Sequence, residues 1–232
     1  MQGKTIVVTG GLGALGSVVA ETAAKRGASV ALIDHAKDAP AGFTERLGGN
    51  ALIVGGVDLT SLPAAEKAMA SVKAKFGRVD ALLNIAGGFQ WQTIADGEVD
   101  AWDRMYALNL KTTLNACKAA LPFLMENGAG RIVNVGAGSA LHAASGFGPY
   151  AASKSAVHRL TESLADELKL KGVTVNAVLP SIIDTALNRR DMPNADFSRW
   201  VAPGDLAAVM LFLASDEAKA VTGALIPVSG RV

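Results

Sequence analysis

Tyr150 and Lys154 are the two residues whose types and spacing indicate chemistry most directly. They are four positions apart in a stretch that contains no Gly or Pro from Tyr150 to Lys171. This spacing places them one turn apart on the same face of a predicted helix. A phenol has a pKa of roughly 10, and a neighbouring ammonium group favours the phenolate. The pair predicts a proton donor and acceptor whose pKa is lowered by its lysine. The alternative is that both residues simply share a solvated helix face.

A glycine-rich turn near the N-terminus predicts a nucleotide site. The apolar run 5–8 has the pattern of a buried strand, and Gly11, Gly13 and Gly16 then satisfy G-x-G-x-x-G at the start of a helical run. Glycines let the backbone approach a pyrophosphate, and a helix N-terminus offers free N–H groups to it. The alternative is a turn with no ligand.

Asp34 ends the next strand, eighteen residues after Gly16. An acidic residue near this position accepts hydrogen bonds from the adenosine ribose hydroxyls. The same carboxylate repels a 2′-phosphate. We therefore expect NAD(H) to be preferred over NADP(H). The alternative is that Asp34 only begins the turn that follows.

Strand-like and helical segments alternate along the whole chain. Strands are predicted at 5–8, 29–33, 52–54, 79–83, 131–135, 173–179 and 224–228. Helices are predicted after the glycine turn, at about 63–76, at about 99–125, from Tyr150 onward and near 203–214. Such alternation predicts an α/β fold: a single-domain, Rossmann-type, doubly wound parallel sheet of about seven strands with helices on both faces. No linker or repeat divides residues 1–232.

Composition narrows the classes of protein. Half of the 232 residues are hydrophobic, 19% are charged, and the net charge of +1 gives no case for nucleic acid or an anionic membrane surface. The uncharged run 132–153 is too rich in Gly and polar residues for a membrane helix, and no signal peptide is visible. We expect a soluble, cytoplasmic protein. The one cysteine, Cys117, suits a reducing compartment and a place in the core. The three histidines lack ligand partners at suitable spacing, so no metal site is expected.

With TGGLGALG, NIAG, YAASK and LASDEAKAVTG in this order, the chain resembles the short-chain dehydrogenase/reductase family over nearly its whole length. The resemblance implies that Asn109 completes a proton relay with the Tyr–Lys pair. It also implies association into a homodimer or homotetramer, and a small-molecule substrate. The cofactor contacts that it implies are Gly10, Gly11, Leu12, Gly13, Leu15, Gly16, Asp34, Asp58, Leu59, Asn84, Ala86, Gly87, Tyr150, Lys154, Pro180, Ile183 and Thr185.

Two positions depart from the family pattern. Ala14 stands where the middle glycine of the turn is usual, which should change the turn without abolishing binding. The family's catalytic Ser lies thirteen residues before the Tyr, where this chain has Ala137. A methyl group cannot donate a hydrogen bond to a carbonyl oxygen. Ser139 is the alternative hydroxyl, and an ordinary loop residue is the other interpretation of it.

The missing hydroxyl is shared with the family's dihydropteridine reductases, which the tract 179–200 also resembles. Ala86-Gly87-Gly88 before Phe89 and Trp91 is a further similarity, whereas Asn109 departs from the animal enzymes. The resemblance implies a substrate-covering segment at about 181–202, and the aromatic side chains Phe89, Trp91 and Trp200 are candidates to stack on a flat substrate.

Three functions follow from these features. The first is hydride transfer from NADH to a quinonoid dihydropterin or a similar flat heterocycle, in which delocalised charge makes the Ser less necessary. The second is a carbonyl or alcohol oxidoreductase that uses Ser139. The third is a non-catalytic cofactor-binding regulator, against which the retention of Tyr150, Lys154 and Asn109 speaks.

Overall fold

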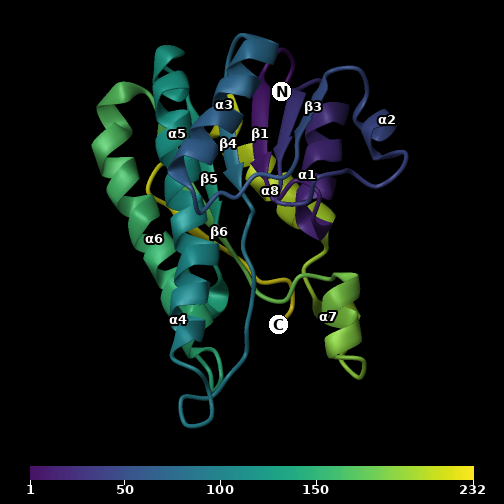
Figure 1. Cartoon of the computed structure of the whole chain (residues 1–232), viewed down its shortest axis with the longest axis vertical. Helices are drawn as coiled ribbons and strands as arrows, with labels where there is room; N and C mark the ends of the chain where they lie inside the picture. The colour runs from purple at the N-terminus through teal and green to yellow at the C-terminus, as the bar shows by residue number, and fades with distance from the viewer.

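Seven parallel strands form one sheet in the computed structural model, which describes residues 1–232 (Figure 1). Their order across the sheet is β3-β2-β1-β4-β5-β6-β7. The strands are β1 Thr5–Thr9, β2 Ser29–Ile33, β3 Ala51–Val54, β4 Ala81–Asn84, β5 Arg131–Val135, β6 Thr174–Pro180 and β7 Leu225–Val228. All six neighbouring pairs are parallel. The predicted fold class is confirmed.

Helices cover both faces of the sheet. They are α1 Ala14–Lys25, α2 Phe43–Leu47, α3 Leu62–Phe76, α4 Asp100–Met105, α5 Thr112–Glu126, α6 Gly148–Leu168, α7 Ala186–Asp191 and α8 Pro203–Leu213. One apolar core contains residues of α1, α2 and α8, and the other contains residues of α3, α5 and α6. Ile6 and Val8 of β1 enter the first core and Val7 enters the second. A strand buried on both faces in this way is apolar throughout, which is why β1 reads as a continuous hydrophobic run.

The helical run predicted at 99–125 is interrupted. The π-helical segment Tyr106–Lys111 joins α4 to α5. π-Helical turns, in which each hydrogen bond spans one residue more than in an α-helix, occur frequently at functional sites. This segment carries the fully buried Asn109. The Tyr–Lys helix α6 begins at Gly148 with Pro149 in its first turn, where the missing N–H of proline costs nothing.

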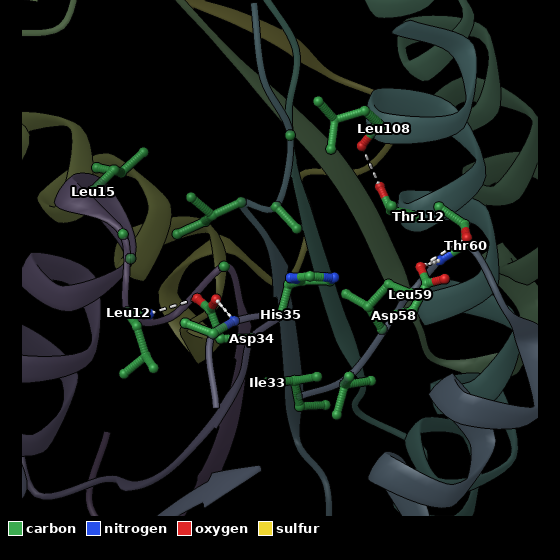
Figure 2. Close-up of a pocket in the computed structure, with 18 of the residues that line it drawn as sticks. Leu12, Leu15, Ile33, Asp34, His35, Asp58, Leu59, Thr60, Leu108 and Thr112 are labelled. Atoms are coloured by element: carbon green, nitrogen blue, oxygen red, sulfur yellow. Dashed lines mark hydrogen bonds between the residues drawn. The ribbon is translucent and has the colours of Figure 1, made fainter. Parts of the chain in front are cut away.

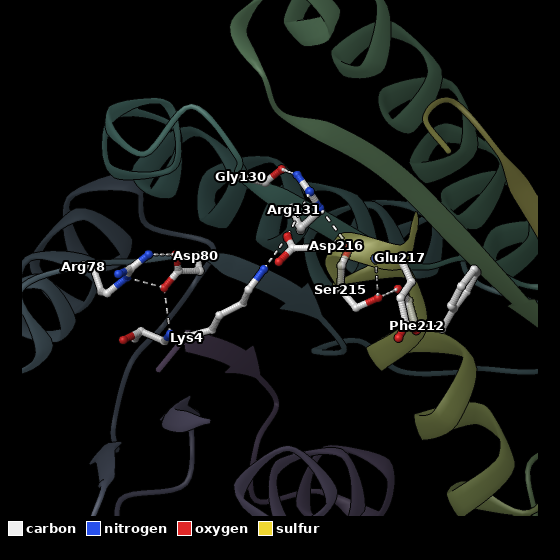
Figure 3. A network of polar contacts seen from close by, with 10 residues as sticks. Lys4, Arg78, Asp80, Gly130, Arg131, Phe212, Ser215, Asp216 and Glu217 are labelled. Carbon is white, nitrogen blue, oxygen red and sulfur yellow. Dashed lines mark hydrogen bonds and ion pairs between the residues drawn. The ribbon is translucent and has the colours of Figure 1, made fainter. Parts of the chain in front are cut away.

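Ion pairs join distant segments at the amino-terminal ends of the strands (Figure 3). The buried Arg131 donates to the carbonyl oxygen of Ser215 and pairs with Asp216, which also pairs with Lys4. Asp80 accepts from the backbone N–H of Thr5 and from the guanidinium of Arg78. Lys4 and Arg131 thus connect the starts of β1 and β5 to the turn after α8, and Asp80, just before β4, connects to β1.

The strand order reverses between β1 and β4, because β2 and β3 lie on one side of β1 and β4 to β7 on the other. The loops that follow β1 and β4 therefore diverge at the carboxyl edge of the sheet, which is where open α/β sheets bind ligands. None of the helices combines the length and the apolar character that crossing a membrane requires.

Candidate active site

A cleft of about 590 Å³ lies at this carboxyl edge (Figure 2). It is lined by Gly10, Leu12, Gly13, Ala14, Leu15, Gly16, Ile33, Asp34, His35, Ala36, Val57, Asp58, Leu59, Thr60, Ile85, Ala86, Gly87, Leu108 and Thr112. The structure thus brings together most of the residues that the sequence proposes for cofactor binding. Gly11 and Asn84 are exceptions, since both are buried and neither lines the cleft.

Two glycines shape the turn after β1. Gly10 has φ of +63°, and a Cβ there would lie 2.9 Å from the backbone of Ala86. A Cβ at Gly16 would overlap the carbonyl oxygen of Gly10. Gly13 instead has an ordinary φ of −75°. The departure at Ala14 therefore leaves Gly10 and Gly16, where a side chain would meet backbone atoms, intact.

Asp34 connects the glycine turn to the loop after β2 (Figure 2). Its Oδ2 accepts the N–H of Leu12 at 2.9 Å, and its Oδ1 accepts the N–H of Ala36 at 2.9 Å. The bond to Ala36 is a local turn contact, so the turn-forming role weighed from the sequence is present as well. Each carboxylate oxygen has a second lone pair free to accept a further hydrogen bond.

A second cavity of about 340 Å³ adjoins the cleft. Ala14, Ile85 and Gly87 line both, so the two spaces meet. The second cavity is also lined by Gly88, Phe89, Tyr150, Lys154, Ile183, Thr185, Ala186, Leu187 and Asn188. Pro180 does not line either cavity. Tyr150 and Lys154, predicted to share a helix face, thus face one space.

The electrostatics of the Tyr–Lys pair differ from the expectation. Lys154 is 5% exposed and its Nζ donates to the carbonyl oxygen of Val135 at 2.7 Å. Burial lowers the pKa of Lys154 to about 8 and raises the pKa of Tyr150 to about 12. The expected lowering of the phenol pKa by the lysine is therefore not found, because burial disfavours the phenolate and the ammonium bonds to the strand end. Tyr150 is protonated at neutral pH.

Asn109 is fixed by hydrogen bonds on both sides of its amide. Its Oδ1 accepts the N–H of Gly88 at 2.9 Å, and its Nδ2 donates to Gly88 O at 3.1 Å and to Ser153 Oγ at 2.9 Å. Ser153 Oγ in turn donates to the carbonyl oxygen of Tyr150. A Cβ at Gly87 would lie 2.6 Å from Asn109 Oδ1 and 3.4 Å from Lys154 Nζ. The amide oxygen and the ammonium therefore flank the same glycine.

The loop after β5 gives no hydroxyl to the second cavity. Ala137 is buried, and its N–H donates to Nε2 of His158 at 3.3 Å. Ser139 lies in the 3-10 turn Gly138–Ala140 and lines neither cavity. Ser139 is therefore not among the residues that line the second cavity with Tyr150.

The three aromatic side chains proposed to stack on substrate separate into different roles. Phe89 lines the second cavity, and its ring meets that of Tyr150 edge to face at a centroid distance of 5.0 Å. Trp91 donates to the carbonyl oxygen of Ser145, and the buried Trp200 packs against Phe197. Of the three, Phe89 alone lines the cavity. Trp91 and Trp200 instead contact residues of neighbouring loops.

Asn84 also has a different place from the one expected. Its Nδ2 donates to Asn134 Oδ1 at 2.9 Å and contacts Cys117 Sγ at 3.2 Å. It thereby joins β4 to β5 beneath the cleft. Cys117 is 1% exposed, in the core position expected from the sequence.

Two residues near the site are missed by the sequence reasoning. His158 holds the loop after β5, and its four-residue spacing from Lys154 is the signal that places it on the same helix face. Asn188 lines the second cavity from α7, and its only sequence signal is its position within the tract 179–200. No three His, Cys, Asp or Glu side chains are grouped as a metal site would need.

Comparison with known proteins agrees with this architecture. The sequence profile of the short chain dehydrogenase family matches residues 4–196. Meso-2,3-butanediol dehydrogenase of Serratia marcescens is 34% identical over 98% of this chain and 93% of its own length. A short-chain type dehydrogenase/reductase from Mycobacterium ulcerans has a structure with TM-score 0.93, 31% identity, and coverage of 100% of this chain and 90% of its own.

A third relative was solved with a cofactor. Carveol dehydrogenase from Mycobacterium avium in complex with NAD superposes with TM-score 0.89 at 26% identity, covering 99% of this chain and 97% of that one. The chain belongs to the short-chain dehydrogenase/reductase family, and it is an oxidoreductase of that family. Resemblance to dihydropteridine reductase in particular is not found among these relatives, two of which are named for a diol and an alcohol.

Proposed function

We propose that this oxidoreductase uses NAD(H) and that Tyr150 exchanges a proton with a small, uncharged substrate. The observation that carries the proposal is the continuity of the two cavities through Ala14, Ile85 and Gly87. One elongated ligand can extend from Asp34 to Tyr150 through them. A dinucleotide has that shape, and when bound its nicotinamide supplies or accepts the hydride.

The residues of the cleft fit a dinucleotide. Gly10 and Gly16 have no room for a side chain, so the backbone N–H groups of the turn lie open to a pyrophosphate. The free lone pairs of the Asp34 carboxylate accept hydrogen bonds from the ribose hydroxyls, and its charge disfavours the 2′-phosphate of NADP(H). We expect Asp58 and Leu59, which also line the cleft, to contact the adenine. The NAD-bound carveol dehydrogenase supports the same cofactor.

The second cavity is lined in part by α7. We expect Ile183 and Thr185, which line this cavity just before α7, to hold the nicotinamide carboxamide, whereas Pro180 at the end of β6 lines neither cavity. Residues of the segment 181–202, from Ile183 to Asn188, thus form part of the wall of the second cavity, as a substrate-covering segment requires.

The proton comes from Tyr150. With a pKa near 12, its hydroxyl is protonated at neutral pH and is ready to donate in the reductive direction. We expect the buried ammonium of Lys154, held by the carbonyl oxygen of Val135, to bind the nicotinamide ribose and so to position the cofactor beside Tyr150. We expect Asn109, whose Oδ1 also lies beside Gly87, to take part in the relay that replaces the proton of Tyr150.

The substrate best supported is a small ketone or secondary alcohol. Meso-2,3-butanediol dehydrogenase and carveol dehydrogenase are named for such alcohols. Apart from Lys154, the residues lining the second cavity carry no charge, which favours an uncharged substrate.

A quinonoid dihydropterin is the second candidate, and one observation favours it. Neither Ala137 nor Ser139 gives the second cavity a hydroxyl. A substrate whose charge is delocalised over a flat ring needs that hydroxyl less. The Phe89 ring at the cavity wall suits a flat ligand.

One assay separates the candidates: NADH oxidation with a panel of small ketones and, in parallel, with quinonoid dihydropterin. Turnover of ketones supports the first proposal, and turnover of the pterin alone supports the second. NADH binding without turnover of either would contradict both and leave the non-catalytic regulator.

We further expect a homodimer or homotetramer. Trp102, Tyr106 and Leu114 leave an exposed apolar strip along α4, the π-helical segment and α5. Light scattering that gives a monomer at micromolar concentration would contradict this expectation.

A further inference from the structure

The second cavity offers few polar groups to a substrate. Its polar side chains are those of Tyr150, Lys154, Thr185 and Asn188. Lys154 is bonded to Val135, and Thr185 Oγ1 accepts the backbone N–H of Asn188 at 3.2 Å. The guanidinium of Arg189, the next residue on α7, is held by the carboxylate of Asp184. Besides Tyr150, Asn188 is therefore the polar side chain of the cavity that is left to contact a substrate.

The amide of Asn188 has one orientation. Its Nδ2 donates to the carbonyl oxygen of Ile183 at 2.8 Å. The reversed amide would place two acceptor oxygens against each other, so Oδ1 must lie on the other side. Oδ1 accepts no hydrogen bond in the structure, and it is not among the buried atoms without a partner. Asn188, which lines the second cavity, thus presents an accessible acceptor, while one of the two N–H groups of its Nδ2 is used by Ile183.

We propose that Asn188 Oδ1 selects substrates that carry a hydrogen-bond donor beside the reducible group. This inference rests on the proposed function of the cavity as the substrate site. An O–H or N–H in the substrate pairs with Oδ1, whereas an apolar group at the same place desolvates the oxygen and leaves it unpaired. Sites built for a hydrogen bond discriminate strongly against analogues that lack it.

Two substrate classes supply such a donor. A hydroxyketone or diol carries an O–H on the neighbouring carbon, and a flat heterocycle carries a ring amide N–H. The shared chemistry is a neutral donor next to the atom that receives the hydride. Asn188 therefore serves either of the two substrates considered above.

The experiment compares matched ligands on the full-length protein. One arm uses 3-hydroxybutan-2-one and 3-methoxybutan-2-one, and the other uses a quinonoid dihydropterin and its N3-methyl analogue. The wild-type protein is expected to favour the donor-bearing member by about tenfold or more in kcat/KM. Asn188→Leu is expected to reduce that ratio to about one, while Asn194→Leu, an exposed asparagine of the same segment, keeps it.

A binding measurement keeps the test independent of turnover. The affinities of butane-2,3-diol and 2,3-dimethoxybutane for the protein with NADH are measured by the fluorescence of the reduced nicotinamide. Selective binding of the diol that is lost in Asn188→Leu supports the role of Asn188. If the same protein reduces no ketone, the proposed ketone reduction is wrong while the role of Asn188 stands. Equal affinities, or binding of neither ligand, would overturn the proposal. So would an Asn188→Leu variant that loses NADH affinity but keeps the wild-type ratio, because Asn188 would then contact the cofactor.

Discussion

The ammonium of Lys154 donates to the carbonyl oxygen of Val135, at 2.7 Å, across the gap between α6 and the end of β5. This bond fixes the lysine beside Gly87 at the bottom of the second cavity. The lysine is 5% exposed there, and such burial of a charge is unfavourable. The site therefore carries a cost in stability that its function requires.

Replacing Lys154 with Met is expected to stabilise the fold and to impair turnover. Burial lowers the pKa of Lys154 from 10.5 to about 8 in the folded protein, so the unfolded chain binds more protons between these values. The cost of the lysine is thus greatest below pH 8 and disappears as the pH rises toward 10.5. We expect Lys154→Met to raise the free energy of unfolding at pH 7 by about 1–2 kcal/mol and to lower kcat by roughly 10²-fold.

Urea denaturation at pH 7 and at pH 9.5 measures this change. The increase in the free energy of unfolding of Lys154→Met over the wild type should be smaller at pH 9.5 than at pH 7. A variant that is less stable than the wild type at pH 7, or equally stabilised at both pH values, would contradict this account of the buried lysine.

His158 gives the protein a second pH-dependent contribution to stability. Its Nε2 accepts the N–H of Ala137, and its pKa is lowered from 6.5 to about 4 by burial and by the nearby charges of Arg159 and Lys154. The unfolded chain binds more protons between these values, so this stability is complete above pH 6.5 and is lost as the pH falls toward 4. We expect His158→Gln to lose less stability than the wild type between pH 7 and pH 5.

The matched control is His142→Gln, which changes an exposed histidine and should keep the wild-type slope. Denaturation midpoints at several pH values give the comparison. Parallel slopes for the wild type and His158→Gln would refute the role assigned to the neutral imidazole.

Asp34 is expected to set the choice between the two nicotinamide cofactors. Asp34→Ala removes the acceptors for the ribose hydroxyls and the repulsion of a 2′-phosphate, so NADH affinity should fall about tenfold and the preference over NADPH should narrow. Fluorescence titration with both cofactors measures this. Asp38→Ala, an exposed acid four residues further along, serves as the control. An unchanged preference for NADH over NADPH in Asp34→Ala would contradict the role assigned to Asp34 in cofactor choice.

The position of the missing hydroxyl can be tested by two substitutions. Because Ser139 lines neither cavity, Ser139→Ala should leave kcat/KM for ketones within about threefold. Ala137 also lines neither cavity, so Ala137→Ser should likewise change kcat/KM by no more than about threefold. Steady-state kinetics on both variants measure these values. A loss of roughly 10²-fold in Ser139→Ala would instead place Ser139 on the substrate.

The sequence predicts the parallel sheet and the ends of its strands well, because patterns within short segments govern them. The apolar runs of β1 and β2 mark buried strands, and Asp34 follows β2 at the edge where ligands bind. The helical spacing of Tyr150 and Lys154 likewise follows from local geometry on α6. These parts of the site are properties of single elements.

The partners of the side chains depend on contacts between distant segments, and the sequence predicts them poorly. The bond from Lys154 to Val135 requires α6 to lie against the end of β5, which no local pattern specifies. Trp91 and Trp200 are aromatic residues near the site in the sequence, but each is used to hold a loop. Helix α7, with Asn188, and the π-helical segment with Asn109 have no distinct periodic signal, because both are a single turn or two long.

The central claim is that Tyr150 is the proton donor of an NADH-dependent reaction. Its most direct test is the steady-state turnover of Tyr150→Phe, measured together with its affinity for NADH. The phenyl ring keeps the contact with Phe89 and removes only the hydroxyl. We predict that kcat falls by about 10²- to 10⁴-fold while the dissociation constant of NADH stays within about twofold. Near-normal turnover in Tyr150→Phe would contradict the account.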